Sequence, residues 1–200
     1  YQLEHFNTTI SKIKNNANKL TDFLINKTDF LVPPIIEKGY EHVYHLYRIS
    51  CNTSDLNIKN TGKFRKLIMN ILKEEGLTTR LYQTHPVYKQ PIFQQVFSQD
   101  KSKLYPWLFN EEYIDLYRQN YSDINHDNTL AVIDNTFAIG DTSSAPFYLT
   151  NPDIVDLYIE GFKKIINNLD QVIDYCNNEK IYTSPYNEIV GLSDTKGIFI

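Results

Sequence analysis

The side chains best suited to chemistry lie close together in the segment 76–93, GLTTRLYQTHPVYKQPIF. Pro86 and Pro91 each remove a backbone donor and fix φ, so the segment between them can be neither a helix nor a central strand. This stiffened loop presents polar side chains that could meet a ligand, namely His85, Tyr88, Lys89 and Gln90. The alternative is a surface loop whose aromatic rings pack onto the core. Residue chemistry alone favours that alternative.

The loop follows elements that would hold it in place. Apolar residues at helical spacing between residues 63 and 75 predict a helix, and Lys73 and Gly76 are a typical stop signal. The alternation from Leu77 to Tyr82 predicts a strand that leads directly into the loop. A helix followed by a strand with a short connection favours a sheet covered by helices on one face.

Two other segments are predicted to join this sheet. Residues 42–51, HVYHLYRISC, are dense in aromatic and β-branched residues, as expected of a central strand. A strand would place His42 and His45 on opposite faces, which excludes a shared metal. Residues 130–139 contain two apolar bursts around Asp134, and they predict a strand or a pair of strands.

Two long amphipathic helices are predicted, one before and one after the segments that form the sheet. Apolar residues spaced by three and four run from Leu3 to Leu24, and this narrow stripe should lie against a long helix of this chain or of a partner subunit. A second helix is predicted from residue 153 to 175, with Thr150 as its cap and Pro152 in its first turn. Residues 176–200 have weak pattern and are expected to be partly disordered.

Composition narrows the classes of function. The chain has 200 residues, a net charge of −4 and no long basic run, which argues against nucleic-acid binding. No apolar run is long enough to span a bilayer. Two distant cysteines, Cys51 and Cys176, suit plain thiols in a reducing compartment, so a cytoplasmic location is expected. No phosphate loop, nucleophile elbow or zinc signature occurs, so the residues alone assign no nucleophile and no general base.

The segment 76–93 resembles part of the DegT/StrS-type sugar aminotransferases, in which the corresponding stretch usually carries Gly-Ile-x-Thr and, further on, Tyr-x-x-Pro-x-His-x-Gln-Pro. Aligned without gaps, the matching residues are Gly76, Thr79, Pro86, Gln90, Pro91 and Phe93. Three further stretches follow in the family's order: residues 2–20 resemble its interface helix, 42–47 its first small-domain strand, and 137–146 with 153–172 its closing strand, loop and helix.

This resemblance implies the C-terminal small domain of a fold-type I pyridoxal phosphate enzyme. Such an enzyme moves an amino group from glutamate to a keto group on a nucleotide-linked sugar, and it works as a homodimer, here through helix 3–25. In this family the lysine that holds the cofactor lies in a large domain upstream, so no catalytic or cofactor-binding residue is carried over. Pyridoxal phosphate is expected in the parent enzyme and not on this chain alone. The chain begins with Tyr1 inside a helical pattern, which suggests a piece of something longer or a trimmed chain.

The proline loop departs from the family at two positions. Tyr88 stands where the family usually has His, and Gln83 stands where it has Tyr. A phenol in place of an imidazole loses a group that titrates near neutrality, so either this loop does not contact the substrate as it does in the family or the substrate differs. Tyr88, His85 and Gln83 are the candidate substrate-binding residues. A second hypothesis is a non-catalytic binding or assembly module that dimerises through its N-terminal helix.

The expected fold is α+β, with a small, mostly antiparallel sheet covered on one face by helices. The expected division is an interface helix over 1–30, a small α+β domain over 31–175 and a tail over 176–200. Under this scheme the sheet is built from residues 43–51, 77–82 and 130–139.

Overall fold

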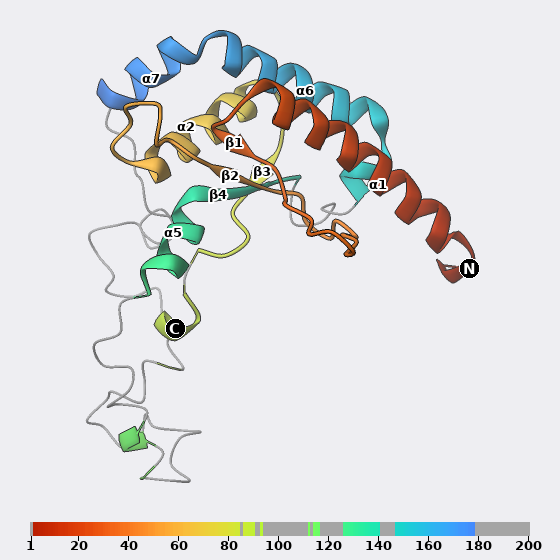
Figure 1. Ribbon diagram of the computed structural model, residues 1–200, viewed down its shortest axis with the longest axis horizontal. Coiled ribbons are helices and arrows are strands. Elements are labelled where there is room, and N and C mark those ends of the chain that lie inside the picture. Colours follow the sequence, from red (N-terminus) through yellow and green to blue (C-terminus); the bar gives the residue numbers. More distant parts are fainter. Residues whose placement is uncertain are drawn as a thin grey trace. The chain divides into compact units, whose positions relative to one another are not determined.

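The computed structural model describes residues 2–84, 86–90, 93, 112, 114–116, 126–140 and 147–178. The chain divides into two compact units, one formed by residues 1–82 with 134–184 and the other by residues 83–133 with 185–200. The first unit contains the sheet and the long helices (Figure 1). No described helix is long and apolar enough to cross a membrane.

A four-stranded antiparallel sheet forms the centre of the first unit. Its order is β1 (Leu31–Val32), β2 (Arg48–Cys51), β4 (Thr136–Ile139) and β3 (Thr79–Arg80). Ile49 pairs with Phe137 and Thr79 pairs with Ile139. Because strand side chains alternate between faces, Leu31, Ile49 and Cys51 are buried on one face, while their neighbours Val32, Arg48 and Ser50 belong to the other, which we call the far face. The predicted α+β class is confirmed.

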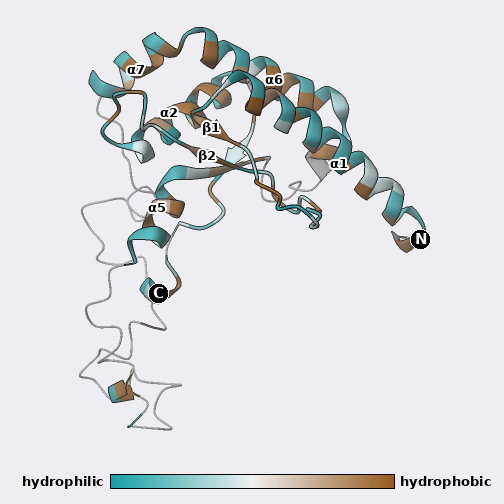
Figure 2. Cartoon of the chain, viewed as in Figure 1, coloured by the Kyte–Doolittle hydropathy of each residue, from teal (hydrophilic) through white to brown (hydrophobic). Residues whose placement is uncertain are grey.

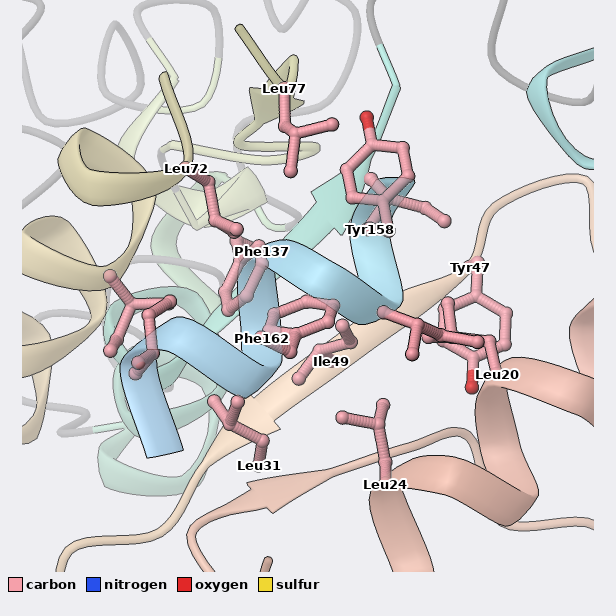
Figure 3. Packing of buried hydrophobic residues seen from close by; sticks show 14 of the residues in the cluster. Leu20, Leu24, Leu31, Tyr47, Ile49, Leu72, Leu77, Phe137, Tyr158 and Phe162 are labelled. Carbon is pink, nitrogen blue, oxygen red and sulfur yellow. The ribbon is translucent and has the colours of Figure 1, made fainter. Parts of the chain in front are cut away.

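Four helices supply most of the remaining hydrophobic core. They are α1 (Gln2–Lys27), α2 (Thr61–Glu74), α6 (Pro152–Asn167) and α7 (Leu169–Asn178). Hydrophobic and hydrophilic bands alternate along α1 and α6, which lie side by side (Figures 1 and 2). Phe162 of α6 packs among Ile49 and Phe137 of the sheet (Figure 3). The period of the apolar residues therefore turns the apolar side of each helix toward the core.

The predicted stripe on α1 is buried mainly by this chain itself. Ile13, Ala17, Leu20 and Leu24 are all at most 3% exposed, and α1 packs against α6 and β1. The structure thus confirms the alternative in which the partner helix belongs to the same chain. Leu3 and Phe6, in the first turns, remain exposed. Dimerisation through this helix stays a prediction.

Helix boundaries follow local capping chemistry. Asn60 caps α2 by accepting from the backbone N–H of Lys63 at 2.9 Å, and Lys73 and Gly76 end the helix as predicted. Asn151, and not Thr150, caps α6 by accepting from the N–H of Asp153 at 3.0 Å. Thr150 belongs instead to the short 3₁₀ helix η5 (Phe147–Thr150). The helix predicted over 153–175 is interrupted at Asn168, where α6 ends and α7 begins.

The three predicted strands are shorter than expected. The segment 77–82 contributes only β3, and the segment 42–51 contributes only β2, because residues 42–47 form a loop. Residues 130–135, predicted as extended, belong to α5 (Asp127–Asn135), which leads directly into β4. The tail from residue 179 onward lies outside the described residues.

A fully buried arginine holds the junction between α5 and β4. Arg65 of α2 is 0% exposed, and its Nε donates to the carbonyl of Asp134 at 2.7 Å. Its Nη1 also lies 3.4 Å from the Sδ of Met69. A charged hydrogen bond to a helix-terminal carbonyl satisfies a group that would otherwise lack a partner.

Alkaline pH is expected to destabilise the fold. Cys51 and Cys176 are free, buried thiols, and burial raises the pKa of Cys51 from 9.0 to about 12, although nearby Arg65 lowers it. The folded state therefore keeps this thiol neutral while the unfolded chain ionises above its ordinary pKa. Stability from this group is complete below about pH 9 and should fall by about 1.4 kcal/mol per pH unit above it. Urea unfolding at about pH 8, 9 and 10 measures the slope, which Cys51→Ala should reduce.

Candidate functional site

The proline loop predicted to meet a ligand is an ordered turn in the second unit. Residues Val87–Lys89 form the 3₁₀ helix η1. The N–H of Lys89 donates to the carbonyl of Pro86 at 2.9 Å, and the N–H of Gln90 donates to that of Val87 at 3.0 Å. Pro86 has φ −59°, which is the value that its ring imposes. The two short hydrogen bonds therefore fix the direction in which Tyr88 and Lys89 leave the backbone.

Tyr88 contacts a histidine that sequence reasoning did not single out. The rings of Tyr88 and His126 lie 4.5 Å apart at 45°, and Lys89 Nζ lies 5.7 Å from the centre of the Tyr88 ring. His126 directly precedes α5, and its carbonyl accepts from the N–H of Leu130 at 3.0 Å. A phenol, an imidazole and an ammonium group thus gather at one point. We call Tyr88, Lys89 and His126 the loop cluster.

Of the other two candidate residues, only Gln83 lies within the described part of the chain. The side chain of Gln83 is exposed. His85 lies outside the described residues. The roles of His85, Tyr88 and Gln83 in binding substrate therefore stay predictions. No signal in the sequence could have joined His126 to the loop, since the two are brought together only by the fold.

A second candidate surface lies in the first unit, on the far face of the sheet. A cavity of about 520 Å³ opens there, and we call it the β1–β2 groove. Its polar side chains are His42, His45, Arg48 and Ser50, and its other lining residues are Val32, Pro33, Pro34, Ile35 and Leu46. The prediction that His42 and His45 point to opposite faces of a strand is wrong, because both line this groove from the loop before β2. The described residues contain no group of three or more side chains suited to a metal.

The loop that carries these histidines is anchored on α1 by two buried tyrosines. Tyr47 shares a 2.7 Å hydrogen bond with Thr21, and the Tyr44 hydroxyl donates to Asn18 Oδ1 at 3.4 Å. Burial raises the pKa of both phenols, so each is a neutral hydroxyl at physiological pH. The two rings stack 5.8 Å apart. The aromatic residues that resembled a strand are therefore the anchors of a loop.

Taken together, the antiparallel sheet and the helices of the first unit define an α+β fold. The chain belongs to the DegT/DnrJ/EryC1/StrS aminotransferase family, whose model matches residues 1–112. This match contains α1, the sheet segment around β2, α2 and the proline loop. It stops at residue 112, so the resemblance of residues 137–146 and 153–172 stays a prediction. No curated protein matches the chain.

The family uses pyridoxal phosphate, and the described residues do not fit this cofactor. Its aldehyde needs a lysine and its pyridine nitrogen needs a charged partner, both inside a pocket. No described lysine is buried. The cavity beside Lys59 and the cavity beside Lys66 and Lys73 are lined by no carboxylate. No step of a reaction can therefore be derived through the cofactor on these residues.

Proposed function

We propose that the chain is the C-terminal domain of a pyridoxal-phosphate-dependent aminotransferase that transfers an amino group from glutamate to a nucleotide-linked keto sugar. The family match over residues 1–112 is the observation that carries the proposal. The helix-covered antiparallel sheet supports it. The exposed or half-exposed position of every described lysine supports a Schiff-base lysine outside these residues.

In this proposal the chain contributes contacts to the substrate and leaves the transfer of the proton to another domain. The loop cluster offers a phenol hydroxyl, an imidazole and an ammonium group, which suit the hydroxyl and phosphate oxygens of a nucleotide-linked sugar. Tyr88 replaces the family's usual His, so a hydrogen bond from a hydroxyl replaces one from an imidazole. The turn η1 holds this hydroxyl in a fixed direction.

A spectral experiment tests whether the Schiff-base lysine lies outside these residues. The 200-residue chain is incubated with pyridoxal phosphate, reduced with borohydride and mapped by peptide mass spectrometry. We expect weak labelling spread over exposed lysines such as Lys12, Lys38 and Lys163, with no stoichiometric aldimine band. The same chain in denaturant is the control for labelling that needs no folded site. Stoichiometric labelling of one lysine in the folded chain alone would contradict the proposal.

One observation favours a second function, a non-catalytic module that assembles through its N-terminal helix. Leu3 is 88% exposed and Phe6 is 54% exposed, and both continue the stripe whose later residues are buried. An apolar stripe that extends beyond its own core is typical of a helix that continues into a partner. Sedimentation at high protein concentration distinguishes a dimer from a monomer. A dimer that is lost when Leu3 and Phe6 are changed to Ser supports assembly through this helix. If the unchanged chain is a monomer, the assembly hypothesis is wrong.

A further inference from the structure

We propose that the β1–β2 groove is a binding site for an oxyanion, either a phosphate or a carboxylate group of a larger ligand. The groove lies in the unit that contains the sheet, and its residues are distinct from the loop cluster. Its volume of about 520 Å³ lies within the range of sites that hold small organic ligands. The inference does not depend on the aminotransferase proposal, because it is argued from the side chains that line the groove.

Among the described residues that line the groove, the only fixed charge is the positive charge of Arg48. Arg48 lines the groove together with His42 and His45, and no carboxylate is among the lining residues. Among the described residues, no carboxylate forms an ion pair with Arg48, although lysines elsewhere on the surface pair with Glu41, Asp156 and Glu160. A half-buried guanidinium without a carboxylate is the group that most readily takes up a planar or tetrahedral oxyanion.

Arg48 is held in a geometry that favours such a contact. Its guanidinium carbon lies 5.4 Å from the centre of the Tyr82 ring. A cation over an aromatic ring is oriented by that ring, while its N–H groups stay available at the edge of the guanidinium plane. The contact with Tyr82 thus restricts the guanidinium before any ligand arrives, which reduces the entropy lost on binding.

A second arginine, Arg80, lies in the same row of the sheet, although it does not line the groove itself. Arg48 pairs with Ala138 across β2 and β4, and Arg80 pairs with the same Ala138 from β3, so the two arginines occupy one row of the sheet. Ala138 of β4 lies between them, so the two arginines are not direct cross-strand neighbours. Within the described part of the chain, Arg80 Nε is buried and has no hydrogen-bond partner. This arrangement costs stability and therefore points to a function.

The loop before β2 adds a hydrogen-bond donor to the residues that line the groove. The backbone N–H of Tyr44 donates to His42 Nδ1 at 2.8 Å. Because Nδ1 accepts this hydrogen bond, the neutral His42 ring carries its proton on Nε2, which makes Nε2 a donor. Tyr44 has φ 52°, a left-handed conformation that costs energy for a bulky residue, and its buried side chain holds it there. Strained backbone of this kind is concentrated at ligand sites.

The groove does not suit a peptide strand as its occupant. Among the strands that the structure describes, β1 lies at the end of the sheet, but Pro33 and Pro34 follow it directly and line the groove. Proline has no backbone N–H, so this edge cannot continue the hydrogen-bonding ladder with an added strand. The cationic wall and the blocked edge together favour a small anionic ligand over a docked chain.

A titration of the full chain with three simple anions tests the proposal. Pyrophosphate, inorganic phosphate and glutarate are each added while ¹H–¹⁵N NMR spectra are recorded. We expect saturable shifts concentrated in residues 42–50 for at least one anion. Arg48→Gln should weaken binding at least about tenfold, as the loss of a charge-assisted pair implies. Lys12→Gln removes the same charge from an exposed position of α1 and should change the affinity less than about twofold.

The outcomes separate the two sources of the anion. Tighter binding of pyrophosphate assigns the groove to a phosphate group, and tighter binding of glutarate assigns it to a carboxylate. His45→Gln, at an exposed position, is a second variant in case Arg48→Gln does not fold, and it should also weaken binding. The proposal is overturned if none of the three anions gives saturable shifts, or if Lys12→Gln weakens binding as much as the folded groove variants do.

Discussion

Phe162→Ala is expected to lower the free energy of unfolding by about 3–5 kcal/mol. Phe162 is 0% exposed, and it lies in the middle of α6 against the sheet (Figure 3). Removing the ring takes away buried apolar area and leaves a cavity between α6, β2 and β4 that the rigid sheet cannot close. Urea denaturation followed by circular dichroism measures the loss, with a linear extrapolation to zero denaturant.

The matched control is Leu157→Ala on the same helix. Leu157 is 58% exposed, so its truncation should change the free energy of unfolding by less than about 0.5 kcal/mol. Both variants place Ala in the same helix, so the difference between them reports burial. Equal losses at the two positions would show that α6 does not pack on the sheet through the side that carries Phe162.

The helices could be predicted from the sequence because their signal is repeated many times. Each turn of α1, α2 and α6 adds another apolar residue at the same spacing, so a single exception does not change the pattern. The residues at which the helices begin and end are harder to predict. Thr150 and Asn151 are both good caps, and only the backbone direction selects Asn151. The break at Asn168 gives no signal, since the apolar period continues through it.

The predicted strands are longer than the observed ones because a buried strand and a buried loop favour the same types of residue. Residues 42–47 are aromatic since Tyr44 and Tyr47 anchor a loop on α1, and a buried strand would have the same composition. The apolar run 130–133 is too short to distinguish helix from strand by its period. In both cases the deciding contacts come from residues far away along the chain.

The candidate site could be predicted only where local chemistry defines it. The two prolines identified the loop, and Tyr88 does form part of a cluster of polar rings there. Its partner His126 and the groove around Arg48 depend on tertiary contacts. Arg65 shows the same limit, because an arginine in an amphipathic helix normally faces solvent and this one is fully buried.

Gly161→Val is expected to lower the free energy of unfolding by about 2–3 kcal/mol. A Cβ added at Gly161 would lie 2.5 Å from Leu77 Cδ1 and 3.1 Å from Leu72 Cδ2. Gly161→Ala gains about 1 kcal/mol of helix propensity, which offsets the displacement of two flexible side-chain ends, so that variant should be nearly neutral. The two further methyl groups of valine need more space than movement of Leu72 and Leu77 can provide. Thermal and urea denaturation of both variants measure this difference.

Glu160→Val is the matched control for placing a β-branched residue in α6. Glu160 is exposed next to Gly161, so its replacement should cost less than about 1 kcal/mol, from helix propensity and the lost pair with Lys163. A loss at Glu160 as large as that at Gly161 would attribute the effect to helix propensity and not to packing.

A double-mutant cycle with Leu77→Ala identifies the contact responsible. Leu77 is 7% exposed, and its truncation alone should cost about 2–5 kcal/mol. If valine at position 161 clashes with the Leu77 side chain, Leu77→Ala removes that clash. The double variant should then lose less free energy of unfolding than the two single losses added together, by about 1 kcal/mol or more. Strict additivity would show that Gly161 lies apart from Leu77, and that α6 does not approach the end of α2 as closely as the glycine permits.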